Sequence, residues 1–171
     1  MSKLIDRIIR AAKLDANLYE EVEADRGAMP QSVGIVILSS LAAGIGSIGR
    51  EWHINIIMGT VFALIGWFVS AYLIYFIGTK IFPEPQTESD QGELLRTIGF
   101  SSSPGMIRVL GVIPGLTGLV FIAALVWMLM ATVVAVRQAL DYTSTLRAIG
   151  VCVIGWVIQL AILGLFFSIW D

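Results

Sequence analysis

The sequence has few of the residues from which metal and catalytic sites are usually built. It contains one cysteine, Cys152, and one histidine, His53, which lie far apart in the chain. A metal site needs several converging ligands, so we expect none, and a single cysteine excludes a disulfide within the chain. Nucleophilic catalysis would need a base beside a serine or a cysteine, and nothing places a serine beside His53. These absences predict a protein that is not an enzyme.

One glycine string, Gly44–Gly49, matches the G-x-G-x-x-G pattern of dinucleotide-binding folds. That pattern also needs a helix that begins after it and an acidic residue about 20 positions further on. Beyond Glu51, however, the next acidic residue is Glu84. We therefore expect no cofactor, and we interpret the glycines as the end of a membrane span.

Charge is scarce and apolar residues are abundant. Charged residues make up 14% and hydrophobic residues 57% of the 171 residues, against about 25% and about 45–50% in soluble domains. The mean hydropathy is +0.84. A soluble domain of this size could not bury so much apolar surface, so part of it must face lipid. The net charge of −2 is nearly neutral, and we expect membrane lipid and other membrane proteins, not nucleic acid, as partners.

The apolar residues form five long segments that predict an all-α, polytopic membrane bundle. Each is long enough, at about 1.5 Å per residue, to cross most or all of a hydrocarbon core about 30 Å thick. The predicted spans lie near residues 32–49, 54–78, 97–113, 116–136 and 148–170. Residues 32–171 would then form the transmembrane domain, and residues 1–31 an amphipathic and acidic helical region in the cytoplasm.

The weakest of these segments is 97–113, which contains three serines, a proline and Arg108. The distribution of cations decides whether it crosses. If it does, only Arg50 and Arg108 of the 11 Lys and Arg residues lie on the outer side. If it does not, Arg137 and Arg147 are exported as well, and the bias weakens. The positive-inside rule therefore favours five spans, with the N-terminus in the cytoplasm and the C-terminus outside.

The N-terminal region predicts two short helices. Apolar residues recur every three or four positions in Met1–Leu14, with cations mainly on the other side. Such an amphipathic helix either lies flat among lipid headgroups or docks on the rest of the protein or on another subunit. Asp15 can cap a second helix, Ala16–Ala28, whose early turns carry Glu20 and Glu21.

Small residues four positions apart are frequent in the first two predicted spans. In lipid, the close approach of backbones at small residues is a main source of helix association. We therefore expect tight contacts there, either within one chain or between the subunits of a homo-oligomer. The pairs are Ser40 with Gly44, Ala42 with Gly46, Gly59 with Ala63, and Gly66 with Ser70.

Two polar residues fall at membrane depth, where polar groups are costly and are candidates for function. Arg108 shares the third span with Ser101 and Pro104. It could line a polar groove, or it could extend its side chain to the outer headgroups. Gln159 is the one amide deep in the last span, and we expect it to form an interhelical hydrogen bond.

Three motifs resemble the YIP1 family, and specifically its short prokaryotic members. Their order and spacing extend over nearly the whole chain. They are Leu18-Tyr19-Glu20-Glu21, Thr97-Ile98-Gly99-Phe100-Ser101 leading to Pro104-Gly105, and Val136-Arg137-Gln138-Ala139-Leu140-Asp141-Tyr142. With the two polar residues at membrane depth, the candidate functional residues are Tyr19, Glu20, Glu21, Gly99, Phe100, Ser101, Pro104, Arg108, Arg137, Asp141, Tyr142 and Gln159.

The resemblance implies a compact five-helix membrane domain with a cytosolic N-terminal region, here in a bacterial cytoplasmic (inner) membrane. Eukaryotic members of the family are associated with Golgi and vesicle trafficking and bind prenylated Rab-type GTPases. Their N-terminal signature is of the Asp-Leu-Tyr-Gly-Pro kind. This chain has Glu20-Glu21 in place of the turn-forming Gly-Pro, so we do not carry GTPase binding over to it.

We expect a non-enzymatic membrane scaffold or adaptor that self-associates or binds partner membrane proteins. The motivating features are the glycine-rich spans, the amphipathic N-terminus and the missing catalytic constellation. The alternative is a channel, transporter or lipid-moving protein that uses a polar groove or an oligomeric pore near the third span. A third hypothesis is membrane shaping by the N-terminal helix.

Overall fold

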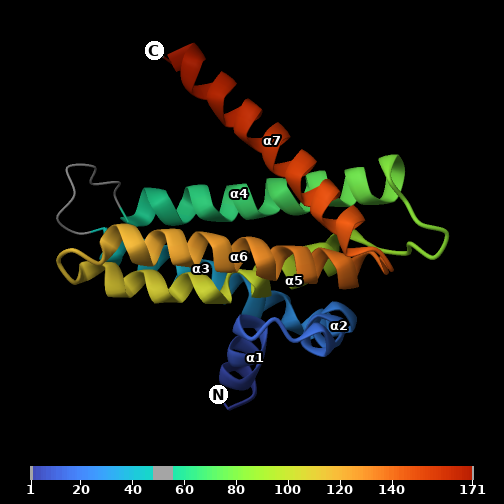
Figure 1. The fold of residues 1–171 in the computed structure, drawn as a ribbon, viewed down its shortest axis with the longest axis horizontal. Coiled ribbons are helices and arrows are strands. Elements are labelled where there is room, and N and C mark those ends of the chain that lie inside the picture. Colours follow the sequence, from blue (N-terminus) through green and yellow to red (C-terminus); the bar gives the residue numbers. More distant parts are fainter. Residues whose placement is uncertain (1, 48–55, 171) are drawn as a thin grey trace.

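The computed structural model describes residues 2–47 and 56–170, and the regular elements in these two ranges are all helical (Figure 1). The all-α prediction is therefore confirmed. Four helices are long and apolar enough to cross a membrane, which agrees with the predicted class. Arg50, Glu51 and His53, which entered the sequence argument, lie outside the described residues.

The four long apolar helices supply most of the bundle. In chain order, they are α3 (Met29–Gly46), α4 (Ile56–Phe76), α6 (Thr117–Ala139) and α7 (Thr145–Trp170). α3 follows a short 3-10 turn, η1 (Arg26–Ala28), and carries Pro30 in its first turn, where the missing N–H loses no hydrogen bond. α4 continues into a π-helical segment, η2 (Ile77–Ile81). At about 1.5 Å per residue, the 23 residues of α6 reach about 34 Å, enough for the hydrocarbon core.

The third predicted span is not one uninterrupted α-helix. It begins inside α5 (Gln91–Ser101) and continues through a 3-10 segment, η3 (Ser103–Val112). α5 starts at a capping box, in which the Glu93 N–H donates to Asp90 Oδ1 over 2.8 Å and the Asp90 N–H donates to Glu93 Oε2 over 2.7 Å. α5 ends shortly before Pro104, because a proline has no N–H to donate to the preceding turn and its ring clashes with that turn.

α5 and η3 run parallel to α3 along most of its length. Three glycines of this segment each approach one small residue of α3: Gly99 approaches Ser32, Gly105 approaches Ser39, and Gly111 approaches Gly46. A Cβ added at Gly99 would lie 2.6 Å from Ser32 Cβ, and one added at Gly111 would lie 2.7 Å from the Gly46 carbonyl oxygen. The contacts advance in the same direction along both segments, so the chain traverses the bundle here in the direction of α3.

Two short helices cover one side of the bundle, against α5, η3 and α6 (Figure 1). They are α1 (Ser2–Ala12) and α2 (Ala16–Ala24), and together we call them the N-terminal layer. Tyr19 of α2 is fully buried in a core that also contains Phe100 of α5. The indole N–H of Trp127, in the middle of α6, donates to the Ala12 carbonyl over 2.7 Å. The first helix therefore docks on the rest of the protein, one of the predicted arrangements.

α1 also exposes a second apolar stripe. Ile5 and Ile9 are 52% and 48% exposed, and Lys3 in α1 and Lys13 just after it are exposed as well. A helix with this pattern can keep its contact with the bundle while its outer face meets the boundary between headgroups and acyl chains.

α7 packs on the bundle through its first half. Ala148, Val151 and Cys152 are buried in a core shared with α4 and α6, whereas Leu160 and Leu165 are 68% and 66% exposed. Figure 1 shows the helix diverging from α4 toward its C-terminus. The diverging half therefore leaves apolar surface on both helices uncovered within the described chain.

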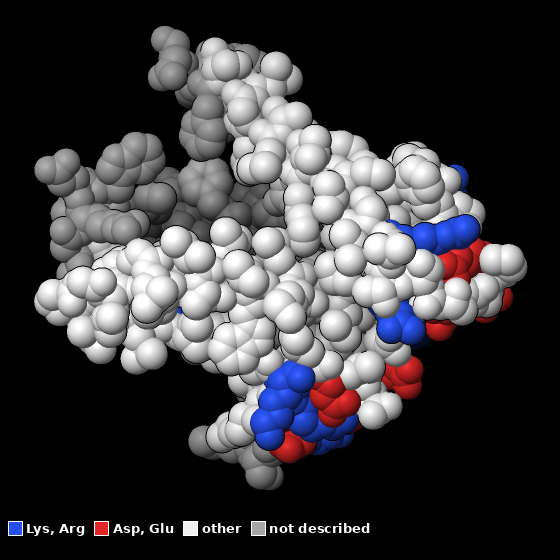
Figure 2. All heavy atoms as spheres, viewed as in Figure 1, with Lys and Arg blue, Asp and Glu red and all other residues white. Residues whose placement is uncertain are grey.

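Charged side chains gather in two places (Figure 2). One is the end of the bundle that carries the loop between α4 and α5, and the other is the surface of the N-terminal layer. The rest of the visible described surface carries almost no charge. Exposed apolar side chains on the long helices include Phe62, Phe68, Leu119, Ile122 and Leu165. Soluble proteins rarely expose apolar surface on this scale, so lipid is the solvent of this belt.

Candidate functional site

An open cavity of about 510 Å³ lies among α3, α4, α6, α7 and the junction of α5 with η3. Its volume falls in the range of small-molecule sites, about 300–1,000 Å³. Part of its wall is apolar and includes Phe121, Met128 and Trp156. Its polar lining consists of Ser39, Ser40, Ser47, Ser70, Ser101, Ser102, Arg108, Thr132 and Gln159. Arg108 and Gln159, which the sequence places at membrane depth, therefore share one cavity.

Arg108 reaches this cavity from η3. Its Nε donates to the Gly105 carbonyl over 2.9 Å, and its Nη2 donates to the Ser39 carbonyl over 3.0 Å and to Ser39 Oγ over 2.7 Å. Ser39 lies in the middle of α3, which ends at Gly46. The side chain therefore turns back toward the centre of the bundle. This contact favours the polar groove over extension to the outer headgroups, and the choice between the two stays a prediction.

The guanidinium of Arg108 has no counter-ion among the described residues. Its Nη1 also lacks a hydrogen-bond partner there. Within the described chain, ion pairs form in the N-terminal layer and between Arg147 and Glu84. Arginine cannot lose its proton in a protein, so burial does not neutralise it. A charge held in this way inside a membrane bundle is costly and marks a candidate site.

Gln159 joins α7 to α4 at the other side of the cavity. Its Nε2 donates to the Gly66 carbonyl over 3.1 Å, which is the expected interhelical hydrogen bond. A Cβ added at Gly66 would lie 3.3 Å from Gln159 Nε2, so the glycine allows this close approach. The pair lies just before the point at which α4 and α7 separate, because every residue of α7 from Leu160 to Leu165 is exposed.

The small residues of α3 and α4 face each other within one chain. Ser40 Oγ donates to Thr60 Oγ1 over 3.0 Å, and a Cβ added at Gly44 would lie 2.9 Å from Ile56 Cγ1. Four further members of the predicted pairs line the cavity: Gly59, Ala63, Gly66 and Ser70. The small residues therefore have two roles in this chain: they allow close contacts between α3 and α4, and they line the cavity.

The bundle and its cavity fall within a known domain. The family model of the Yip1 domain matches residues 27–167, which is more than half of the chain. The chain belongs to the YIP1 family. No curated protein and no solved structure matches it. The match covers nearly all of the YIP1 bundle from α3 to α7 and begins after the N-terminal layer.

The YIP1 motif in the third span fastens α5 to its neighbours. Gly99 allows α3 to approach closely, and Phe100 is fully buried against the N-terminal layer. Ser101 Oγ lies 3.1 Å from Thr132 Oγ1 of α6. Pro104 is buried where α5 gives way to η3. These residues hold the broken segment in place beside Arg108.

The YIP1 motif after α6 ties that helix to the end of α4. The Tyr142 hydroxyl lies 2.7 Å from the Phe82 carbonyl and 3.0 Å from the Gly78 carbonyl. Burial raises the pKa of Tyr142 to about 12, so the hydroxyl keeps its proton for these acceptors. Arg137 Nε donates to the Tyr142 carbonyl over 3.2 Å, and Asp141 adopts a positive φ of 52° in the turn before α7. None of these three residues lines the cavity.

The N-terminal motif docks α2 on the bundle. The hydroxyl of the buried Tyr19 donates to the Ala11 carbonyl of α1 over 3.3 Å. Glu20 accepts a hydrogen bond from Gln138 Nε2, at the end of α6, over 2.7 Å. Glu21 accepts hydrogen bonds from two arginines of α1. The three motif residues are thus all engaged within the chain.

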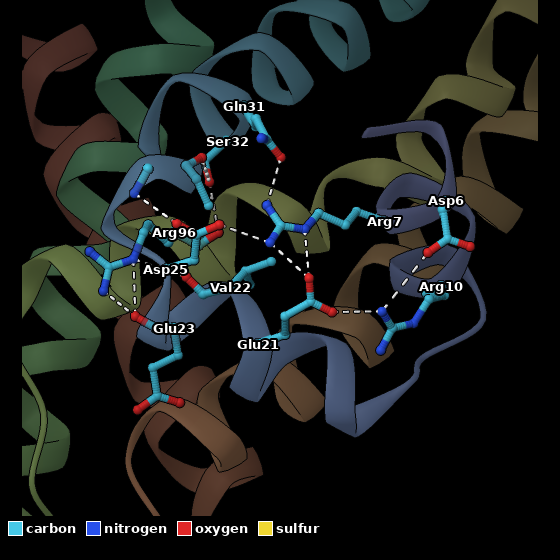
Figure 3. Close-up of polar contacts among 12 residues, drawn as sticks. Asp6, Arg7, Arg10, Glu21, Val22, Glu23, Asp25, Gln31, Ser32 and Arg96 are labelled. Carbon is cyan, nitrogen blue, oxygen red and sulfur yellow. Dashed lines mark hydrogen bonds and ion pairs between the residues drawn. The ribbon is translucent and has the colours of Figure 1, made fainter. Parts of the chain in front are cut away.

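Arg7 is a buried cation that sequence reasoning missed. It is 1% exposed, although the helical pattern places it on the polar side of α1. Figure 3 shows it among Glu21, Asp25 and Gln31. Nη2 donates to Glu21 over 2.7 Å and to Asp25 over 2.8 Å, and Nη1 donates to Gln31 over 3.0 Å. The sequence signal for this site is the pair of carboxylates one helical turn apart.

Arg96 is a second buried cation that sequence reasoning did not single out. It is 5% exposed, and its Nε donates to the Val22 carbonyl over 3.0 Å and to the Glu23 carbonyl over 3.1 Å (Figure 3). The last carbonyls of a helix have no intrahelical partner, and a cation suits the negative helix end. Arg96 therefore caps α2 from α5 and has a structural role.

Proposed function

We propose that the protein resides in a bacterial cytoplasmic membrane and crosses it five times. Support for the fifth crossing comes from the path of α5 and η3, which follows α3 from Ser32 to Gly46. If α3 crosses the membrane, the segment beside it covers the same depth. The cation distribution then gives a cytoplasmic N-terminus and an outer C-terminus. Residues 1–31 would form the cytoplasmic region, and residues 32–171 the transmembrane domain.

The function that the geometry supports best is the non-enzymatic binding of a guest molecule drawn from the membrane, as in a lipid-moving protein or transporter. One observation carries this proposal. The Arg108 guanidinium faces a cavity of about 510 Å³ and has no counter-ion among the described residues. A guest in the cavity would supply the missing partner.

Packing alone does not account for this arrangement. The two buried arginines with packing roles lie elsewhere: Arg7 pairs with Glu21 and Asp25, and Arg96 caps the end of α2. Arg108 differs from both because it faces a cavity. Hydroxyl and amide groups line the part of the cavity around Arg108, and a polar space in a protein holds water or another polar occupant. Small residues such as Ala63 keep this space open.

The first test fills the cavity. Ala63 lines it from α4, so the phenyl ring of Ala63→Phe would occupy part of it. The full-length protein is reconstituted into lipid vesicles, and the movement of a fluorescent phospholipid between leaflets is measured together with ion flux. We expect movement with the wild-type protein and the loss of most of it in Ala63→Phe. Ala123→Phe, on an exposed face of α6, is the matched control and should keep the wild-type rate.

A guest that binds without being moved is detected in a second measurement. Lipid retained by each purified protein in mild detergent is quantified by mass spectrometry. Ala63→Phe should retain less lipid than the wild type, and Ala123→Phe should retain as much. Equal retention and equal movement in all three proteins would contradict guest binding in this cavity.

A scaffold or adaptor role is the second proposal, and the second half of α7 supports it. Leu160, Leu163 and Leu165 are exposed within the described chain. An apolar helix face of this kind can pack against a partner membrane protein or a second copy in the bilayer. The mass of the protein in mild detergent tests the proposal, with a homo-oligomer or a co-purified membrane protein expected. A strict monomer with no co-purified membrane protein would contradict it.

A further inference from the structure

The cavity wall beside Arg108 offers hydrogen-bond donors and carries no negative charge. Arg108 Nη1 and Ser102 Oγ lack hydrogen-bond partners among the described residues, and both residues line the cavity. Ser39 Oγ accepts from Arg108, so its own proton remains available to another acceptor. No Asp or Glu of the described chain lines the cavity. Such a wall suits an anion with several oxygen atoms.

A phosphate group satisfies this wall better than a cation or a neutral group does. Arginine presents a planar fork of donors that matches the oxygen atoms of a phosphate. A cation would be repelled by the guanidinium. A neutral group would leave a buried charge without compensation, which is strongly unfavourable. Phosphate is also the anionic group that membrane lipids bring to the bundle.

The remaining wall of the cavity is apolar and leads toward lipid. Ile56, Phe121 and Met128 line the same cavity as the guanidinium. Beyond the contact between Gly66 and Gln159, α4 and α7 separate (Figure 1). An acyl chain can leave the cavity at this point while the headgroup stays beside the donors.

We propose that the guest is an amphiphile with an anionic phosphate headgroup, such as a glycerophospholipid, whose phosphate binds Arg108 Nη1 and the Ser102 hydroxyl. The inference rests on the proposed function, because it names the guest of the same cavity. The phosphate belongs to a lipid and not to free inorganic phosphate, since the apolar wall adds binding that only an acyl chain can use.

The test is a binding titration of the full-length protein in detergent micelles with a fluorescent phosphatidylglycerol. The competitors are unlabelled phosphatidylglycerol, diacylglycerol, which lacks the phosphate, and inorganic phosphate. We expect unlabelled phosphatidylglycerol to displace the probe and diacylglycerol to leave it bound. Inorganic phosphate should need a concentration roughly a hundredfold higher, because it lacks the apolar chain.

Variants of the wall give the test its specificity. Arg108→Gln removes the charge and should weaken binding roughly ten- to a hundredfold, the range for a hydrogen bond to a charged group. Arg108→Lys keeps the charge and should recover part of the affinity. Arg147→Gln makes the same change of charge at an arginine whose side chain is 52% exposed, and it should bind as the wild type does.

Ser102→Leu provides an independent variant if Arg108→Gln does not fold, as judged by gel filtration and circular dichroism. Ser102 Oγ makes no hydrogen bond within the described chain, so its loss leaves the bonds of Arg108 in place. The larger apolar side chain should narrow the phosphate site and weaken phosphatidylglycerol binding.

Two results would overturn the inference. One is wild-type affinity in Arg108→Gln, or in Ser102→Leu where Arg108→Gln does not fold. The other is displacement of the probe by diacylglycerol or by inorganic phosphate at the concentration at which phosphatidylglycerol acts. Ala63→Phe separates this failure from that of the proposed function. If Ala63→Phe loses the probe while Arg108→Gln still binds it, guest binding in the cavity stands and the phosphate site is wrong. If Ala63→Phe binds the probe as the wild type does, both the proposed function and this inference are contradicted.

Discussion

Arg7 is buried and Arg108 is half-buried, and the two differ in what neutralises them. Arg7 donates to two carboxylates, Glu21 and Asp25, and to the amide of Gln31. Arg108 donates to carbonyl and hydroxyl oxygens, and no carboxylate of the described chain pairs with it. The first cation is satisfied by its own layer. The second is left with a charge that the described chain does not balance.

The difference separates a structural region from a candidate functional one. In the N-terminal layer, the buried Arg7 has carboxylate partners supplied by neighbouring segments, so its role there is packing. In the YIP1 bundle, the unbalanced charge coincides with the cavity. The comparison predicts that changes at Arg7 act on stability and that changes at Arg108 act on binding.

The largest expected effect on stability is that of Arg7→Ala. It leaves Glu21 and Asp25 without their common partner and should destabilise the N-terminal layer by about 2–3 kcal/mol. The value lies below the full cost of breaking a buried pair, because the two carboxylates are 37% and 36% exposed. Hydrogen exchange of the backbone amides of α1 and α2 measures it. Lys3→Ala, at an exposed cation, should exchange like the wild type. Unchanged exchange in Arg7→Ala would contradict a structural role for Arg7.

A second change acts where α5 meets α3. In Gly99→Ala, the added Cβ would lie 2.6 Å from Ser32 Cβ, and such overpacking should cost about 1–3 kcal/mol. Thermal unfolding in mild detergent measures the loss. Gly34→Ala is the matched control, because a Cβ at Gly34 meets no atom within 4 Å. If both variants unfold at the wild-type temperature, α5 does not approach α3 as closely as described.

Arg108→Gln should change stability by less than about 1 kcal/mol, because the lost hydrogen bonds and the removal of an unbalanced charge offset each other. The measurement is the same thermal unfolding, followed beside the binding titration. A variant that binds phosphatidylglycerol weakly yet unfolds like the wild type sharpens the comparison. A loss of stability as large as that of Arg7→Ala would assign Arg108 a structural role and contradict the distinction between the two arginines.

A pH dependence within the N-terminal layer is also expected. Burial, with the neighbouring Glu93 and Asp141, raises the pKa of Glu23 to about 7. Its ordinary pKa is lower, so the fold favours the protonated form. The resulting destabilisation is absent at acidic pH, grows as the pH rises toward 7 and is complete above it. Hydrogen exchange of the α2 amides, corrected for the intrinsic pH dependence of exchange rates, should show greater protection at pH 5.5 than at pH 8. Glu23→Gln should abolish this difference.

The class of the fold follows from the sequence, because lipid is the one solvent that suits long apolar segments with so few charges. The hydrogen bond of Gln159 was predictable for a related reason, since an amide at membrane depth needs a partner. The motif residues Gly99, Phe100 and Tyr142 were also indicated by the sequence. Their contacts fasten helices together, however, and the pattern alone does not distinguish such a role from binding.

The environments of the two arginines could not be predicted, because they depend on contacts between distant segments. Arg7 lies on the polar side of its helix by periodicity, and its burial requires α2 to dock with Glu21 and Asp25 toward it. The direction of Arg108 depends on the parallel register of η3 with α3, which places Ser39 within its reach. The spacing of residues within one segment indicates neither how α2 docks on α1 nor how η3 lies against α3.

Photocrosslinking tests the central claim, that the cavity holds a lipid from the membrane, most directly. The full-length protein is placed in nanodiscs with a phosphatidylglycerol that carries a diazirine near its headgroup, and the adducts are mapped by mass spectrometry. We predict adducts on the cavity residues Phe121 and Gln159, fewer of them in Arg108→Gln, and unchanged adducts on the lipid-facing Phe62. Adducts confined in the wild type to outward residues such as Phe62 and Ile122 would contradict the account.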